Sequence, residues 1–270
     1  AVELSSNKQL MQADKWLQEH KISMVNPKKV QENVKEYKAG DWLLMLDYSL
    51  ESYPLLCSEF QRVRDAGAQV ITAVYDLFAL RLASSNATKS SKKPFEKWIQ
   101  LAIQESNGLV CASRTVADQL IDYIQKNCLG RPGLKVGWWH LGSSLSVKEE
   151  VLQKKEFRHK LYALMVGMLD PRKNYHLALD AFEILWSQGH SLELVVVGEK
   201  GCLGDSLVDR LEAHPEKNSK LFVYYDLSDE ELSQCYKSAL FILSLSTDEG
   251  FALPLIEAAH HHIPIVCSDI

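Results

Sequence analysis

The second half of the chain alternates short apolar runs with amphipathic segments, and this order limits the fold more than any other feature. Each apolar run is too short for a core helix and is bounded by polar or turn-forming residues, which predicts a strand. The predicted strands lie at 162–167, 192–198, 221–224, 240–245 and 264–267, and the predicted helices at 175–188, 204–213, 228–237 and 254–262. Apolar strands separated by helices predict a parallel sheet that is covered on both faces.

The first half shows a similar but less regular alternation. Its predicted strands lie at 42–47, 69–74, 108–111 and 135–140, and its predicted helices at 51–66, 95–106 and 113–127. The strand at 42–47 is expected to be buried, Gly67 to stop the first helix, and Ser113 to cap the third. Residues 83–94 are rich in Ser, Lys and Asn, which predicts a loop.

A polar, charged stretch at 142–158 predicts the connection between two domains. We therefore expect an α/β protein with domains at 1–145 and 146–270, whose parallel sheets face each other across a cleft.

Composition excludes several classes of protein. The chain is 46% hydrophobic and 24% charged, which is typical of a globular protein, and no apolar stretch is long enough to span a membrane. Residues 1–150 carry a net charge of +2 and residues 151–270 one of −7, so nucleic acid is not an expected partner. The slightly basic first half is compatible with contact to an anionic membrane surface. We expect reduced core cysteines at Cys57, Cys111, Cys128, Cys202, Cys235 and Cys267.

The most informative motif spans residues 246–257, where two carboxylates eight positions apart follow an apolar run. Glu249 is expected in the loop at the carboxyl end of the strand. Pro254 favours the start of a helix, which would place Glu257 on its first turn. Ligands of open α/β sheets bind at this edge, so the two acids could accept hydrogen bonds from the hydroxyls of a sugar and of a ribose.

A second motif follows the first strand of the same domain. Arg172 and Lys173 directly precede a helix, whose N-terminus already favours an anion. Two adjacent cations there suit a diphosphate; taken alone such a dipeptide is better explained as a solvated pair in a turn, but its position at the same sheet edge as Glu249 and Glu257 favours phosphate binding. Gly198 follows the next strand, where a glycine allows close approach of a ligand or merely a tight turn.

Together these pieces resemble glycosyltransferase family 4, the retaining, GT-B, group 1 glycosyl transferases, and within it the bacterial mannosyltransferases. The matching stretches are VYDL (74–77), CASRTVADQL (111–120), HLGSSL (140–145), VGMLDPRKNYHLALDAFEILWSQG (166–189), LELVVVGEKG (192–201), LSDEELSQCY (227–236) and EGFALPLIEAAHHHIPIVCSDI (249–270). The resemblance implies two facing Rossmann-like domains: a partial acceptor-side domain at 1–145 and an incomplete nucleotide-sugar-binding domain at 146–270. Relatives begin earlier and continue further, so we expect the chain to be truncated at both ends.

The resemblance also implies the roles of the site residues. Glu257 would hold the ribose of the nucleotide-sugar donor, and Glu249 would contact the transferred sugar. Lys173 and Arg172 would neutralise the leaving diphosphate. Further donor contacts are expected from Gly250, Phe251, Ala252, Leu253, Gly167 and Gly198. Neither a metal nor a cofactor is expected, because protein cations serve the diphosphate.

Three positions depart from the pattern of the family. Met168 stands where many relatives have an Arg, and Tyr75 stands where many have a His. His262 occupies a helix end where relatives often have Gly, which predicts a left-handed backbone there.

The implied activity is transfer of a hexosyl group, with mannose from GDP-mannose favoured. The acceptor would be a glycan or a lipid-linked saccharide in polysaccharide, O-antigen or lipopolysaccharide biosynthesis, handled in the cytoplasm or peripherally on the inner face of the membrane. The alternatives are a UDP-sugar transferase or epimerase on the same fold, and a non-catalytic nucleotide-sugar-binding fragment.

Other polar and aromatic residues are given structural interpretations. Three consecutive histidines at 260–262 point in different directions on a helix and are not expected to bind a metal. Trp138 and Trp139 are expected in the core. Asp76 and His140 are candidates for ligand contact, with turn capping an equal alternative.

Overall fold

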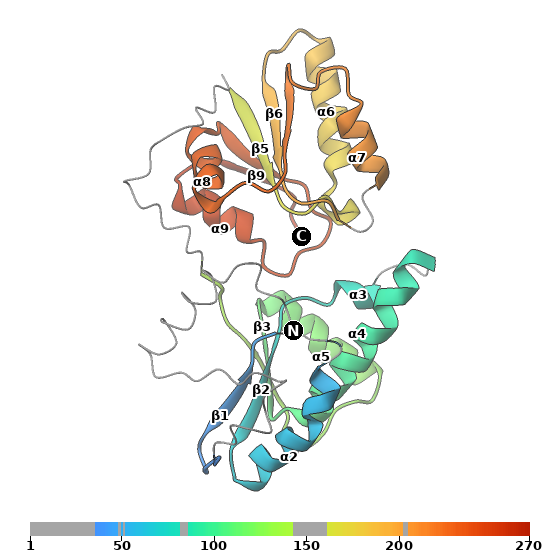
Figure 1. The fold of residues 1–270 in the computed structure, drawn as a ribbon, viewed down its shortest axis with the longest axis vertical. Helices are drawn as coiled ribbons and strands as arrows, with labels where there is room; N and C mark the ends of the chain where they lie inside the picture. The colour runs from blue at the N-terminus through green and yellow to red at the C-terminus, as the bar shows by residue number, and fades with distance from the viewer. Residues whose placement is uncertain (1–35, 48–49, 51, 82–85, 143–160, 202–204) are drawn as a thin grey trace. The chain divides into compact units, whose positions relative to one another are not determined.

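The computed structural model describes residues 36–47, 50, 52–81, 86–142, 161–201 and 205–270. The chain divides into two compact units, Ala1–Trp139 and His140–Ile270. Each unit contains a parallel sheet with helices packed on it, so the expected α/β class is confirmed (Figure 1). The domain boundary predicted at residue 145, and nearly all of the connection predicted at 142–158, lie outside the described residues.

Unit 1 has a four-stranded parallel sheet in the order β1-β2-β3-β4, so neighbours in sequence are neighbours in the sheet. Its strands are β1 (Trp42–Met45), β2 (Gln69–Val74), β3 (Gly108–Cys111) and β4 (Lys135–Trp138). Its helices are η2 (Tyr53–Leu56), α2 (Cys57–Asp65), α3 (Phe78–Arg81), α4 (Asn86–Glu105) and α5 (Arg114–Lys126).

Two local signals in unit 1 act as the sequence predicts. Gly67 follows α2 with a φ of +76°, a backbone conformation that glycine adopts without steric cost. Ser113 caps α5, because its Oγ accepts a hydrogen bond from the Val116 amide at 3.2 Å.

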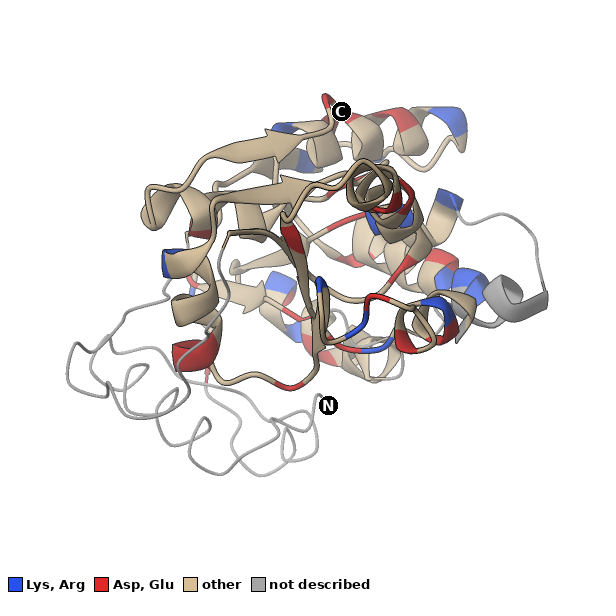
Figure 2. Cartoon of the chain, turned by 90° about the horizontal axis from the view of Figure 1, so that it is seen from above, with Lys and Arg blue, Asp and Glu red and all other residues tan. Residues whose placement is uncertain are grey.

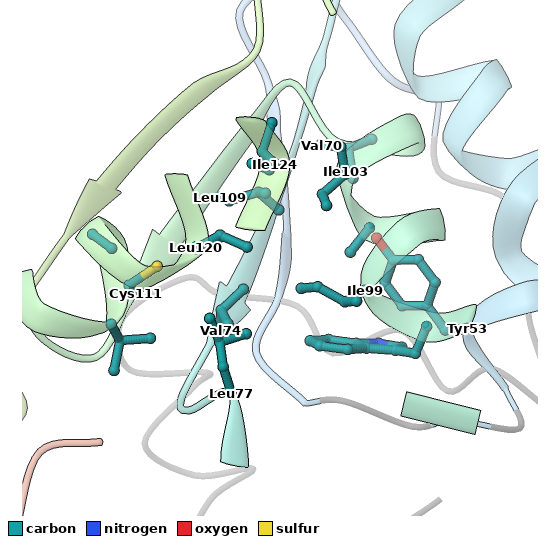
Figure 3. Close-up of a cluster of buried hydrophobic side chains, with 14 of the residues drawn as sticks. Tyr53, Val70, Val74, Leu77, Ile99, Ile103, Leu109, Cys111, Leu120 and Ile124 are labelled. Atoms are coloured by element: carbon teal, nitrogen blue, oxygen red, sulfur yellow. The ribbon is translucent and has the colours of Figure 1, made fainter. Parts of the chain in front are cut away.

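The core of unit 1 joins the sheet to α2, α4 and α5 (Figure 3). Alternate residues of β2, Val70 and Val74, point into it together with aromatic side chains from η2 and α4. Tyr53 and Trp98 are both almost fully buried, with ring centroids 6.1 Å apart in an edge-on arrangement. Burial of each large side chain contributes about 1.5–3 kcal/mol, so this cluster holds the helices on the sheet.

Three predictions for unit 1 are wrong. Within the described residues β1 pairs only with β2 and is not buried, and its Trp42 is 66% exposed. The loop predicted at 83–94 is largely helix, because α4 begins at Asn86 and includes Pro94. A polar composition fits a solvated helix as well as a loop, so it does not separate the two. Trp138 lies on the edge strand β4, 49% exposed, and its ring is 5.8 Å from the Arg114 guanidinium.

Unit 2 has a five-stranded parallel sheet in the order β7-β6-β5-β8-β9. Its strands are β5 (Tyr162–Val166), β6 (Glu193–Val197), β7 (Leu221–Tyr224), β8 (Phe241–Ser244) and β9 (Ile265–Cys267). Its helices are η3 (Pro171–Lys173), α6 (Tyr175–Ser187), α7 (Asp205–Glu212), α8 (Asp229–Ser238) and α9 (Leu253–His260).

Helices cover both faces of this sheet, as the apolar strands predict (Figure 1). Side chains of β5 alternate between the two cores: Ala163 and Met165 join the core that contains α6 and α7. Tyr162 and Leu164 join the core that contains α8 and α9. This two-sided burial explains why the strand sequence is apolar throughout.

The end of α9 takes the left-handed turn that the sequence predicts. His262 has a φ of +57°, and the amides of His262 and Ile263 bond back to Ala259 and Ala258 at 3.1 and 3.2 Å. These two hydrogen bonds form the usual glycine-type helix stop, here built on a histidine.

The cysteine prediction holds only in part. All five cysteines within the described residues are free thiols, of which Cys111 and Cys235 are buried. Cys128 and Cys267 are exposed, which contradicts a core role. Cys267 lies on β9, which pairs only with β8 within the described residues and whose three residues are all exposed there. Cys202 lies outside the described residues.

Candidate functional site

The strand order of unit 2 reverses at β5, which has β6 and β7 on one side and β8 and β9 on the other. In an open parallel sheet, the loops that leave the two central strands diverge at such a point and form a ligand crevice. Here these loops are residues 167–174 after β5 and 245–252 after β8. The Thr247 amide donates to the Arg172 carbonyl at 2.8 Å, which ties the loops together.

The first loop presents its two cations on a short, capped turn. The Asp170 carboxylate accepts a hydrogen bond from the Arg172 amide at 3.0 Å and caps η3. Asn174 then takes a left-handed conformation, with a φ of +57°, and leads into α6. Asparagine tolerates this conformation better than most residues, so the Pro-Arg-Lys-Asn sequence encodes the turn directly.

Glu249 is the centre of the charged cluster, which we call the inner cluster: Arg172, Lys173 and Glu249. The Lys173 ammonium donates to one carboxylate oxygen of Glu249, and an Arg172 guanidinium nitrogen lies 3.4 Å from the other. The Ser246 hydroxyl also donates to Glu249, at 2.6 Å. The side chains of Lys173 and Glu249 are only 12% and 14% exposed. The structure thus brings together the three residues predicted to be catalytic.

The charges in this cluster nearly cancel. Arg172 also lies 3.6 Å from Asp170, so two cations face two carboxylates. An anionic ligand would therefore compete with Glu249 for the same cations. This competition was not foreseen from the sequence, where the acid and the cations were assigned to separate parts of a ligand.

Two glycines allow the backbone to pack tightly beneath the cluster. A side chain on Gly198 would place its Cβ only 1.9 Å from the Gly167 carbonyl oxygen. Gly167 itself has a φ of +138°, and its carbonyl accepts a hydrogen bond from the buried Tyr175 hydroxyl at 2.7 Å. Burial and the nearby Glu249 carboxylate raise the pKa of Tyr175, which keeps its hydroxyl a donor. Gly198 therefore has a packing reason to be glycine, whether or not it approaches a ligand.

The second loop ends at α9. Ala252 has a left-handed backbone, with a φ of +61°, and the helix begins at Leu253 with Pro254 in its first turn, as predicted. Among the described residues, the amides of Gly250, Phe251 and Ala252 donate to no backbone carbonyl. These groups are consequently available to a ligand at a helix N-terminus.

Glu257 lies one position beyond the first turn of α9, which corrects the sequence prediction. The helix starts one residue before Pro254, so Glu257 is its fifth residue. Its carboxylate accepts a hydrogen bond from the Tyr236 hydroxyl of α8 at 2.6 Å. Tyr236 was not singled out from the sequence, because its partner lies on another helix and no local pattern marks the pair.

The remaining candidates are placed as follows. Asp76 accepts a hydrogen bond from the Phe78 amide at 3.2 Å, which is turn capping, and His140 is exposed. The Tyr75 hydroxyl donates to the Leu46 carbonyl at 2.6 Å. Met168 is 48% exposed. Within the described part of the chain, no three His, Cys, Asp or Glu side chains gather as a metal site would require.

The chain is similar to known proteins both in sequence and in fold. Residues 147–270 match the family model "Glycosyl transferases group 1". The chain also superposes on TarM with a TM-score of 0.59 and 16% identity, over 90% of this chain and 44% of that one. An α,α-trehalose 6-phosphate synthase from Burkholderia multivorans gives a TM-score of 0.62 and 12% identity, over 89% and 59%.

The chain has the GT-B fold, and its second unit matches the group 1 glycosyl transferases. The GT-B prediction from sequence is confirmed as far as the fold of the two parallel-sheet units. Because the sequence identity is only 12–16%, these structural matches show the fold and nothing further.

Curated relatives of this GT-B chain are mannosyltransferases. The serotype-specific mannosyltransferase WbdA of Escherichia coli is 31% identical over 245 residues, which is 87% of this chain and 30% of WbdA. The O-antigen chain mannosyltransferase B of Escherichia coli is 32% identical over 121 residues, or 44% of this chain and 32% of that one. The chain thus spans about a third of the length of these relatives. Among its described helices, none combines the length and apolarity that a bilayer crossing demands.

Proposed function

We propose that this chain is part of a retaining glycosyltransferase of family 4 that transfers mannose from GDP-mannose to a glycan or lipid-linked saccharide in O-antigen or polysaccharide assembly. The observation that carries the proposal is the inner cluster, in which a carboxylate and two cations meet at the switch point of the sheet. The mannosyltransferase relatives support the sugar and the pathway class.

In the proposed mechanism the two cations act on the leaving group. Negative charge develops on the diphosphate as the sugar–phosphate bond breaks, and Lys173 and Arg172 offset it in a site with little water. The amides at the start of α9 add to this stabilisation.

Glu249 changes partners when the donor binds. The diphosphate takes the two cations, so the carboxylate is released to accept hydrogen bonds from hydroxyls of the transferred sugar, while Glu257 accepts from the ribose. Attack from the face of the departing phosphate would retain the anomeric configuration, and no protein nucleophile is assigned. Work on an acceptor carried by a lipid would place the protein peripherally on the inner face of the membrane.

Binding and turnover test this proposal separately. Calorimetry with GDP, UDP and guanosine should show that GDP binds more tightly than guanosine, because the diphosphate engages the inner cluster, and more tightly than UDP. Incubation with GDP-mannose and a mannan-type acceptor should release GDP. If neither GDP nor UDP binds, the proposal is overturned. If UDP binds more tightly than GDP, the donor is a UDP-sugar rather than GDP-mannose. Tight GDP binding without any transfer would identify a binding module instead.

A further inference from the structure

Tyr236 is a buried polar residue whose hydroxyl reaches the edge of the proposed donor site. Its side chain is fully buried between α8 and α9, and its hydroxyl donates to Oε2 of Glu257 at 2.6 Å. Buried hydroxyls are normally satisfied by backbone or neutral partners, and a hydrogen bond to a carboxylate is about twice as strong.

The Tyr236 ring is held by a stacking contact as well as by the hydrogen bond of its hydroxyl. The His261 ring stacks on it with centroids 5.4 Å apart and an angle of 12° between the planes. The His261 Nε2 in turn lies 3.5 Å from the Ser233 hydroxyl. Burial and the Glu257 carboxylate raise the pKa of Tyr236 well above its ordinary value, so the phenol remains a donor at any pH at which the protein is folded.

This arrangement leaves the two oxygens of Glu257 unequal. Oε2 is held by Tyr236, whereas Oε1 accepts no hydrogen bond from any residue in the described part of the chain. A free glutamate side chain samples several rotamers, and fixing it in one of them on binding costs conformational entropy. The hydrogen bond from Tyr236 imposes that order before any ligand arrives.

We propose that Tyr236 is a positioning residue, which holds the Glu257 carboxylate so that Oε1 faces the ribose hydroxyls of the nucleotide donor. The inference rests on the proposed function, because it assumes that Glu257 binds the ribose. Tyr236 itself touches neither donor nor acceptor; it acts through Glu257.

The test compares ligands with and without ribose hydroxyls. Tyr236→Phe should weaken GDP binding about tenfold, the effect of losing a hydrogen bond to a charged group. It should leave the binding of 2′,3′-dideoxy-GDP unchanged, because that ligand has no hydroxyl for Glu257 to accept. UDP and its dideoxy analogue replace these ligands if the chain prefers UDP.

Tyr162→Phe is the matched control. Tyr162 belongs to the same buried cluster, but its hydroxyl donates to the Cys235 carbonyl at 2.7 Å and does not touch Glu257. This variant should lose a similar amount of stability in thermal unfolding and bind GDP as the unmodified protein does.

Each outcome separates the inference from the function beneath it. Equal losses for GDP and the dideoxy ligand in Tyr236→Phe would mean a merely structural tyrosine and would overturn the inference. A loss of GDP affinity in Glu257→Gln but not in Tyr236→Phe would overturn the inference alone. If the unmodified protein binds both ligands equally, or neither, the ribose role of Glu257 fails and the inference fails with it.

Discussion

Unit 2 contains two clusters of paired charges that look alike in sequence but differ in surroundings. The inner cluster lies between two loops at the carboxyl edge of the sheet. The outer cluster lies between α6 and α7 and consists of Asp180, Glu183, Arg210 and His214. Figure 2 shows the Lys, Arg, Asp and Glu residues mainly on helices and loops. The outer cluster joins two helices, whereas the inner cluster lies on loops at the edge where open parallel sheets bind ligands.

In the outer cluster, Arg210 is paired with two carboxylates that are exposed to solvent. Arg210 bonds Asp180 at 2.5 Å and Glu183 at 2.9 Å, and these carboxylates are 57% and 42% exposed. The His214 Nε2 lies 3.1 Å from the Glu183 carboxylate, and its Nδ1 accepts a hydrogen bond from the Glu216 amide at 3.1 Å. Exposed pairs of this kind contribute about 0–1 kcal/mol.

The inner cluster differs because its Lys173 and Glu249 side chains are only 12% and 14% exposed and because its residues lie on loops rather than on helix faces. The electrostatic interactions of such charges are stronger, and their loops already converge at the place where parallel sheets bind ligands. Clusters of oppositely charged side chains can therefore support packing in one place and be suited to binding in another.

The largest expected effect is on the rate of mannosyl transfer, which should fall when the inner cluster is changed but not when the outer cluster is changed. Lys173→Ala should lower the rate of mannosyl transfer about a hundredfold or more, because one of two charges that stabilise the leaving diphosphate is lost. Arg210→Ala, which removes a cation from the outer cluster, should leave the rate within about twofold. Steady-state kinetics with GDP-mannose measures both. A comparable loss of rate in both variants would show that the two clusters do not differ in function.

A smaller expected effect is a gain rather than a loss, and it concerns the affinity for GDP. Glu249→Gln should tighten GDP binding about three- to tenfold, because the carboxylate no longer competes with the diphosphate for Lys173 and Arg172. Sugar transfer should still fall. Calorimetry on Glu183→Gln gives the matched control, which should bind GDP unchanged. Weaker GDP binding by Glu249→Gln would show that the carboxylate supports the diphosphate contacts rather than opposing them.

The smallest effect is a pH dependence of the outer cluster. Burial raises the pKa of Glu183, but hydrogen bonds from Arg210 and His214 outweigh it, and the net pKa lies below its ordinary value. A depressed carboxyl pKa adds stability above the unfolded value of about 4.5, and that stability is lost as the pH falls through the folded pKa. Glu183→Gln should therefore be less stable at pH 7 by under about 1 kcal/mol.

Chemical denaturation at several pH values measures this difference. The two proteins should converge in stability as the pH falls below about 4.5, where both the folded and the unfolded carboxyl take up a proton. A difference that persists unchanged at low pH would mean that Glu183 contributes by packing and not by its charge.

The sequence predicts what local chemistry determines. The strand β2 follows from a run of apolar residues and the cap at Ser113 from its place before an amphipathic segment, whereas the left-handed turn at His262 was expected from the resemblance to the family. The Pro-Arg-Lys-Asn turn and the Glu249 loop were placed at one sheet edge because parallel strands end together.

Properties that depend on distant neighbours were not predicted. Trp138 and Cys267 are exposed because β4 and β9 are the outermost strands within the described residues, a position that no local sequence pattern marks. The pairing of Tyr236 with Glu257 joins residues 21 positions apart on different helices. The ion pairs of Glu249 join side chains of two separate loops, 76 and 77 positions apart in the sequence.

The contact between Gly198 and the Gly167 carbonyl offers a means of control that touches no charge. A methyl group at position 198 would act as a wedge beneath the turn that presents Arg172 and Lys173, since backbone cannot yield as a flexible side chain does. Tilting that turn would misalign both cations at once without removing any ionisable group. An enzymologist could thereby separate the effect of where the cations stand from the effect of how much charge they carry.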